Sequence, residues 1–325
     1  ARTIVKAVRP DRDHLEIRFP RVTGYRIELP EERLSARFNS DSTLVLSPEL
    51  VGPTITRNSG IIGQEADITL EHLDTMRKSA LLYNLTEQLL ITKWRDPGEE
   101  PRFGLFPQLK RITRQWLDDY LICEGDTYPG LLMYKELADM ACERITVAIS
   151  ASFEGEKPVK AIIDAYNPEG STAHVLFSTS KPFYVTDARK CHIDKVVYDS
   201  DWEAEFCRVV ESHDRVISYV KNHSLGFEVP YRYGSTQRIY IPDFILKVDV
   251  DADEPLNLIV EIKGYRGEDA KDKKNTMDAY WIPGVNNTKK YGRWAFAEFT
   301  DVFSLEENLT DLIDAKITAI IGRYQ

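Results

Sequence analysis

One short segment limits what this chain can fold into: the apolar run from Leu256 to Ile262, in which the only charged residue is Glu261. Runs of this length that are rich in Leu, Ile and Val are typical of strands buried in a sheet. Side chains alternate between the two faces of a strand, so Glu261 and Lys263 project from one face and Ile262 from the other. Because a charged pair on a buried face is costly unless it is compensated, this segment predicts a strand with a functional or paired charge at its end.

A second acid precedes this run. Pro242-Asp243 lies within a strand-like stretch from Arg238 to Val248, and a polar turn separates that stretch from the run that contains Glu261. Two neighbouring strands would bring Asp243 and Glu261 to the same end of a small sheet. Their carboxylates, with the backbone carbonyl of Ile262, are the hard oxygen ligands that Mg²⁺ prefers, and Mn²⁺ can replace it. Such an ion would activate a water and neutralise charge on a phosphodiester, and Lys263 would orient that water or stabilise the transition state.

The pattern Glu-x-Lys is weak by itself, because an ion pair between strands at a sheet edge gives the same pattern. Its context favours the metal site. An amphipathic helix, capped by Asp199-Ser200 and with apolar positions from Trp202 to Val220, precedes the two strands and carries Glu203 and Glu205. A Lys-rich helix is expected to follow at about 270–281.

The periodicity predicts two domains and an α/β (α+β) fold. Residues 1–198 are expected to form a linker or docking domain, with strands in 1–65, helices in 66–150 and a hairpin in 151–198 made by residues 161–166 and 174–177. Residues 199–325 are expected to form a mixed sheet flanked by helices. Its elements are the helix after Asp199, three strands between 227 and 262, the Lys-rich helix, a strand at 293–299 and a helix at 305–321.

Composition excludes some classes of protein. The formal net charge of -10 argues against a passive nucleic-acid binder, since phosphate contacts dominate such binding, although a partner can supply the basic groove for a nuclease. The four cysteines are scattered without zinc-site spacing, which predicts reduced thiols in the cytoplasm. No apolar run is long enough to cross a membrane. The opening residues resemble no signal peptide and lack Met, which favours a piece of a longer protein.

Several stretches together resemble the C-terminal endonuclease region of type III restriction enzymes. The matching stretches are Ile17-Arg18-Phe19-Pro20, Gly24-Tyr25-Arg26, Phe106-Pro107-Gln108-Leu109-Lys110, Trp116-Leu117, Asp199-Ser200-Asp201-Trp202-Glu203, Val220-Lys221-Asn222, Leu225-Gly226-Phe227, Pro230-Tyr231, Tyr240-Ile241-Pro242-Asp243-Phe244, Val260-Glu261-Ile262-Lys263-Gly264 and Tyr291-Gly292-Arg293-Trp294. The resemblance implies a restriction-endonuclease-like fold of the PD-(D/E)xK class, Mg²⁺-dependent cleavage of double-stranded DNA, and a role in defence against foreign DNA. Asp243 and Glu261 match the metal-binding acids, and Lys263 matches the catalytic lysine.

This class of nuclease often adds a glutamate from a helix. Glu203 is the first choice, because its spacing from Phe206 and Val210 places it beside the buried face of the helix, and Glu205 is the alternative. A favourable charge at a helix N-terminus would explain either residue without any catalytic role.

In these enzymes the nuclease lies behind a helicase motor that uses ATP, and the restriction subunit works with a DNA methyltransferase subunit. This sequence contains no G-x-x-x-x-G-K-[ST] loop and no helicase acidic box, so we expect ATP to be bound by the parent protein and not by this chain. Residues 1–198 would then link motor and nuclease or dock partner subunits. Two alternatives stay open: a catalytically silent docking module, and a nuclease of another DNA-processing system.

Overall fold

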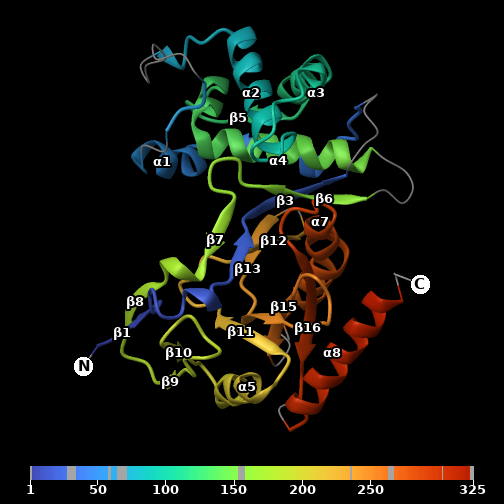
Figure 1. Ribbon diagram of the computed structural model, residues 1–325. Helices are drawn as coiled ribbons and strands as arrows, with labels where there is room; N and C mark the ends of the chain where they lie inside the picture. Colours follow the sequence, from blue (N-terminus) through green and yellow to red (C-terminus); the bar gives the residue numbers. More distant parts are fainter. Residues whose placement is uncertain are drawn as a thin grey trace. The chain divides into compact units, whose positions relative to one another are not determined.

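The computed structural model describes residues 2–27, 34–57, 60–63, 72–152, 158–234, 236–262, 267–301 and 303–322 (Figure 1). Its internal contacts divide the chain into two compact units. Unit 1 comprises Ala1–Tyr25, Val159–Ala161 and Asn167–Gln325, and unit 2 comprises Arg26–Pro158 and Ile162–Tyr166. Unit 2 is therefore an insertion into the sequence of unit 1.

This division differs from the expected boundary between residues 198 and 199. Residues 1–25 and 167–198 belong to the same unit as residues 199–325. The physical reason is long-range packing: the ring of Phe19 lies 5.2 Å from that of Phe227, and the Tyr25 hydroxyl donates to the carbonyl of Pro230 at 2.8 Å. Contacts between residues so far apart in the chain leave no signal in local periodicity.

Unit 2 is mainly helical and has one apolar core. Its elements are β4 (Leu44–Leu46), α1 (Pro48–Arg57), α2 (Lys78–Lys93), α3 (Phe106–Asp119), β5 (Leu121–Cys123) and α4 (Lys135–Ala151). The three long helices, which lie within the expected helical region 66–150, meet in this core, where Leu85, Leu109, Trp116 and Ile145 are buried. These apolar side chains serve packing.

Helix α1 corrects the expectation of strands in residues 1–65. The backbone N–H of Leu50 donates to the Ser47 hydroxyl at 3.2 Å, so Ser47 caps the first turn. Pro48 stands at the first helical position, where its missing N–H costs nothing. Pro48 thus marks the start of a helix.

Unit 1 is built on a four-stranded mixed sheet in the order β11-β14-β15-β16. Its strands are β11 (Val216–Lys221), β14 (Phe244–Val248), β15 (Leu256–Ile262) and β16 (Arg293–Phe299). β14 runs antiparallel to β11 and β15, whereas β15 and β16 are parallel. The parallel pair requires a crossover, which contains α6 (Ala270–Thr276), a π-helical turn (Met277–Trp281) and α7 (Ile282–Asn286). The inner position of β15 explains its apolar sequence.

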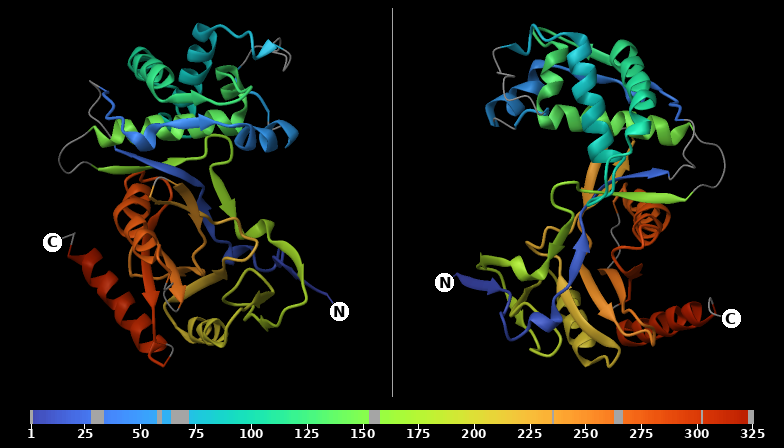
Figure 2. Two further views of the ribbon diagram at one scale, coloured as in Figure 1. Left: turned by 180° about the vertical axis from the view of Figure 1, so that it is seen from behind. Right: turned by 45° about the horizontal axis from the view of Figure 1, so that its top comes forward.

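Helices α5 (Asp201–Ser212) and α8 (Leu305–Ile321) lie beside this sheet and contact each other (Figure 2). Phe206 of α5 is fully buried, and its ring lies 4.8 Å from that of Phe244 and 6.0 Å from that of Phe299. Trp294 is buried against Trp281, so it is a core residue. Mixed α/β architecture, as expected, is confirmed, together with the strand at 293–299 and the helix at 305–321.

The remaining strands of unit 1 form two-stranded pairs. They are β1 (Thr3–Lys6), β2 (Arg18–Pro20), β7 (Glu169–Ser171), β8 (Leu176–Thr179), β9 (Phe183–Val185), β10 (Lys195–Val197), β12 (Val229–Tyr233) and β13 (Thr236–Tyr240). Of these pairs, β1 with β8 and β2 with β7 join distant segments, whereas β9 with β10 and β12 with β13 are local. The expected hairpin of residues 161–166 with 174–177 is wrong, because β8 pairs with β1 and β6 (Val159–Ile163) pairs with β3 (Val22–Ile27). Among residues 158–198, which the structure describes, β9 and β10 form the local pair that a turn would predict.

The helix expected from Trp202 to Val220 is also shorter than its apolar spacing indicated. α5 ends at Ser212, and residues 216–221 form strand β11. Val216, Tyr219 and Val220 are buried in that strand, where β-branched and aromatic side chains fit well. Among the helices that the structure describes, none has the length and apolar character needed to cross a membrane.

Candidate active site

Asp243 lies at the junction between β13 and β14, next to the end of β15. The antiparallel register pairs Phe244 with Val260, which places Asp243 beside Glu261. Its Oδ2 accepts a hydrogen bond of 2.8 Å from the backbone N–H of Ile262. The structure therefore brings the two predicted acids together at one end of the sheet, as the sequence predicted.

Asn222 holds the backbone at this junction. Its side-chain Nδ2 donates to the carbonyls of Phe227 and Pro242 at 2.8 and 2.9 Å, and its backbone N–H donates to the carbonyl of Asp243 at 2.8 Å. The side chain is buried. Asn222 therefore fixes the position of Asp243 without facing a substrate, and sequence reasoning gave it no role.

Glu261 is held by a tyrosine. The Tyr240 hydroxyl donates to Oε2 of Glu261 at 2.5 Å. Burial and then the negative charge of Asp243 raise the pKa of Glu261 to about 7, although the bond from Tyr240 acts in the opposite direction. Burial likewise raises the pKa of Asp243, against the opposing charge of Lys221. Two neighbouring carboxylates that resist ionisation gain most from a bound cation.

Glu203 reaches the site through Lys221. Ser200 caps α5 by accepting from the backbone N–H of Glu203, and Glu203 is 8% exposed. The Lys221 Nζ lies 2.7 Å from Oε1 of Glu203 and 3.5 Å from Oδ1 of Asp243. Glu205, the alternative, is instead paired with Arg208 on the exposed side of the helix. Of the two candidate helix acids, the structure therefore brings Glu203 to Asp243.

Lys221 was missed because its segment was predicted to be helical. At the end of β11 it faces Asp243 across the antiparallel pair, in which Lys221 is the register partner of Phe244. A usable signal was present, since residues 216–220 are mostly β-branched or aromatic. Lys263, the predicted catalytic lysine, lies outside the residues that the structure describes.

The carboxylates of Asp243 and Glu261 fit a divalent cation. They are adjacent, partly buried and raised in pKa by burial and nearby charge, so a positive ion would offset their repulsion. Within the described ranges, no group of three or more His, Cys, Asp or Glu side chains is placed to hold a metal. A pair of carboxylates with the Ile262 carbonyl suits Mg²⁺, which keeps several positions for water and phosphate.

Two lysines of α6 lie beside these acids. The Lys273 Nζ is 5.5 Å from the centre of the Tyr240 ring, and it pairs with Asp269 at 3.6 Å. The Lys274 Nζ is 3.9 Å from the carboxylate of Glu298, the residue next to Glu261 on the parallel strand β16. The Lys-rich helix thus places two ammonium groups, each paired with an acid, near this end of the sheet.

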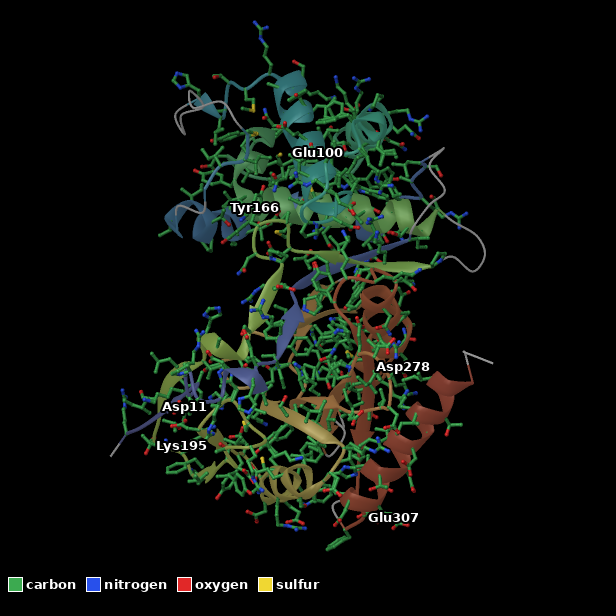
Figure 3. The ribbon with its side chains drawn as sticks, viewed as in Figure 1. Asp11, Glu100, Tyr166, Lys195, Asp278 and Glu307 are labelled. Carbon is green, nitrogen blue, oxygen red and sulfur yellow. The ribbon has the colours of Figure 1, made fainter. Side chains whose placement is uncertain are left out.

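Other negative charges lie on exposed acids of both units, and Figure 3 labels four of them, Asp11, Glu100, Asp278 and Glu307.

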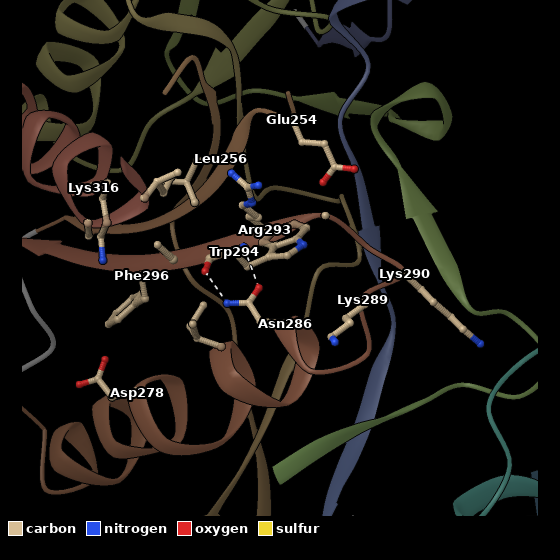
Figure 4. Close-up of a pocket in the computed structure, with 15 residues that line it drawn as sticks. Glu254, Leu256, Asp278, Asn286, Lys289, Lys290, Arg293, Trp294, Phe296 and Lys316 are labelled. Atoms are coloured by element: carbon tan, nitrogen blue, oxygen red, sulfur yellow. Dashed lines mark hydrogen bonds between the residues drawn. The ribbon is translucent and has the colours of Figure 1, made fainter. Parts of the chain in front are cut away.

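A cavity of about 600 Å³ in unit 1 lies away from the site of the acids, beside α7, β16 and the end of α8 (Figure 4). It is lined by Lys289, Lys290, Arg293 and Lys316, and by none of Glu203, Asp243 and Glu261. It is therefore distinct from the site of the acids.

Comparison with known proteins agrees with this placement. Residues 189–282 match a family model described as an endonuclease domain. The matched stretch contains α5 and β11 to β15, with Glu203, Asp243 and Glu261. No curated protein and no solved structure matches the chain significantly. The family match supports a nuclease hydrolase that acts on DNA.

Proposed function

We propose that this chain is a Mg²⁺-dependent endonuclease that hydrolyses phosphodiester bonds of double-stranded DNA. One observation carries the proposal. The Asp243 carboxylate is bound to the backbone N–H that follows Glu261, inside the stretch that matches an endonuclease domain. Two acids fixed side by side by backbone hydrogen bonds, near lysines, form a site for a cation and a phosphate together.

Each side chain of the site has a separate role in the proposed reaction. Asp243 and Glu261 hold the ion, with the carbonyl of Ile262 as a further ligand, and Tyr240 and Asn222 fix the orientation of the acids. When bound, Mg²⁺ supplies Lewis acidity that lowers the pKa of a coordinated water and offsets charge on the phosphate. Lys263 orients the attacking water or stabilises the negative charge that develops on the phosphate. Lys273 attracts the DNA backbone toward the acids.

We place this nuclease at the C-terminal part of a type III restriction subunit or of a closely related helicase-nuclease, acting in the cytoplasm against foreign DNA. The resemblance described above supports this context. ATP would be used by the motor of the parent protein, and a DNA methyltransferase subunit would be its partner. Because the motor would deliver the substrate, we expect the isolated chain to cleave DNA weakly.

The test is cleavage of plasmid DNA by the intact parent assembly with ATP and Mg²⁺. Asp243→Ala and Lys263→Ala should each lower the cleavage rate by at least about 100-fold, as expected when a group that stabilises transition-state charge is lost. The matched control is Asp253→Ala, which removes an exposed acid from the connection between β14 and β15 and should leave the rate unchanged. Normal cleavage by the Asp243 variant would refute the site.

Calorimetric titration with Mn²⁺ separates this proposal from the silent docking module. The nuclease should bind Mn²⁺ with an affinity that depends on Asp243 and Glu261. A chain that binds no Mn²⁺ and supports no cleavage in the assembly would be a docking module. A cleaving assembly whose parent chain lacks a helicase motor would instead belong to another DNA-processing system.

A further inference from the structure

The Lys221 side chain is an almost buried cation inside the proposed metal site. It is 9% exposed, and its Nζ lies 5.2 Å from the centre of the Phe244 ring. Its two acidic neighbours are Glu203 at 2.7 Å and Asp243 at 3.5 Å. A buried ammonium at such distances offsets the charge of both carboxylates, so it acts as a counter-ion that the chain itself provides.

The two contacts of Lys221 are unequal. Glu203 is fixed on both oxygens, because Oε2 accepts from the backbone N–H of Asp199 at 2.9 Å while Oε1 binds Lys221. Asp243 uses Oδ2 for the N–H of Ile262, and only Oδ1 faces Lys221, at the longer distance. Lys221 is therefore held by Glu203 and only loosely by Asp243.

Oδ1 of Asp243, the oxygen at the longer distance from Lys221, is also the oxygen that would bind a metal. Since Oδ2 of Asp243 already accepts from the backbone, Oδ1 is the oxygen best placed to bind a divalent cation beside Glu261. A divalent ion at that position and the Lys221 ammonium would repel each other strongly, because both charges are partly shielded from water. The two cations must therefore compete for Asp243.

We propose that Lys221 is a resident counter-cation that competes with the divalent ion for Asp243 and sets the metal affinity of the site. Glu203 is then a positioning residue: it holds Lys221 away from Asp243 and does not bind the metal. This inference rests on the proposed function, since it assumes that a divalent ion binds Asp243 and Glu261. It assigns a regulatory cation to a site for which the sequence predicted only ligands and a catalytic lysine.

The proposal predicts opposite effects for two neutralising substitutions. Lys221→Met removes the competing charge and should tighten Mn²⁺ binding by about tenfold or more, given the strength of charge interactions at this separation. Glu203→Gln frees Lys221 to pair fully with Asp243 and should weaken Mn²⁺ binding. A merely structural role for Lys221 would give weaker binding, because the acids would lose their support.

The double variant Lys221→Met with Glu203→Gln is the decisive protein. Removing both partners of a buried ion pair is often nearly neutral for stability, whereas removing one is costly, so the double variant should fold even if Lys221→Met does not. The proposal predicts that it binds Mn²⁺ more tightly than the wild-type chain. If Glu203 were a metal ligand, the double variant would bind Mn²⁺ more weakly than Lys221→Met does. Should Lys221→Met not fold, the comparison is with the wild-type chain, and a metal-binding Glu203 again predicts weaker binding by the double variant.

The experiment is calorimetric titration of the full chain with Mn²⁺ at pH 8, with thermal melting of each variant in the absence of metal. Lys195→Met is the matched control, because it removes a lysine paired with Asp194 at 2.6 Å on β10, and it should leave Mn²⁺ affinity unchanged. Equal or weaker binding by the double variant would overturn the inference alone. Absence of Mn²⁺ binding by the wild-type chain, or unchanged binding after Asp243→Asn, would overturn the proposed function itself.

Discussion

The two units differ in how their buried charged side chains are paired. In unit 2, Arg26 and Asp96 form an ion pair of 3.5 Å with side chains 3% and 10% exposed, and Arg26 also covers the Trp94 ring. In unit 1, Lys221 faces two acids, and Glu261 lies beside one of them. Two opposite buried charges offset each other without any external ion. Among the described residues the site holds three acids around one buried amine, and our proposal is that a divalent cation offsets this imbalance.

The largest effect on stability should come from unit 2. Asp96→Asn removes a carboxylate that pairs with the buried Arg26 guanidinium, which should lower the free energy of unfolding by up to about 3 kcal/mol. Denaturant unfolding monitored by circular dichroism measures this change. Mn²⁺ affinity should stay at the wild-type value, and an altered affinity would show that the charges of unit 2 are not purely structural.

Replacing Asp243 of the site by Asn should not lower the stability of the metal-free protein, in contrast to Asp96→Asn. Because the pKa of Asp243 is raised in the folded protein, its ionised form is disfavoured there relative to the unfolded chain. Asp243→Asn should therefore preserve or raise the melting temperature of the metal-free protein, by a few degrees at most. It should also abolish the stabilisation that Mn²⁺ gives. A large loss of stability without metal would mean that Asp243 serves the fold, like Asp96.

Glu261 should make Mn²⁺ binding depend on pH. Its pKa is raised from the model-compound value of 4.5 to about 7, so the folded protein keeps a proton that the unfolded chain has already lost between these values. The stability of the metal-free protein should therefore fall as pH rises from about 4.5 to 7. Mn²⁺ affinity should rise by up to about tenfold per pH unit up to pH 7 and level off above it.

Titration with Mn²⁺ between pH 5.5 and 8.5 tests this expectation, with Glu261→Gln as the comparison. That variant should bind more weakly and lose the dependence that is centred near pH 7. A dependence that survives the substitution would assign the proton to another group.

The smallest effect should follow Tyr240→Phe. The Tyr240 hydroxyl lowers the pKa of Glu261 by donating to its carboxylate, so its loss should move the midpoint of the pH dependence upward. A hydrogen bond of ordinary strength corresponds to a shift of roughly one pH unit or less. The same Mn²⁺ titrations measure the midpoint, and a downward shift would contradict the direction of this hydrogen bond.

Strands with a strong local signal could be predicted from sequence. The run at 256–262 and the strand at 293–299 have the predicted bounds, because apolar residues flanked by turn residues define them without help from distant parts. The meeting of Asp243 with Glu261 followed from two consecutive strands. By contrast, the spacing of apolar residues around His213 fitted a continuous helix, although the chain turns there and continues as β11.

Because this segment was predicted to be helical, the role of Lys221 in the site was not predicted. Lys221 acquires its neighbours only when β11 pairs with β14, and Asn222 contacts Pro242 across the same pair. The pairings of β8 with β1 and of β6 with β3 were invisible for a related reason, since their partners are separated by more than a hundred residues. Local periodicity contains no information about such partners.

The insertion of unit 2 into the sequence of unit 1 imposes an order on synthesis at the ribosome. Phe19 is made about two hundred residues before its partner Phe227, which corresponds to roughly 10 to 40 seconds of translation. Nearly all of unit 2 is complete before β7 and β8 appear. Strands β1 and β2 are therefore without their partners until unit 2 has been synthesised, and Asp243 and Glu261 are made later still.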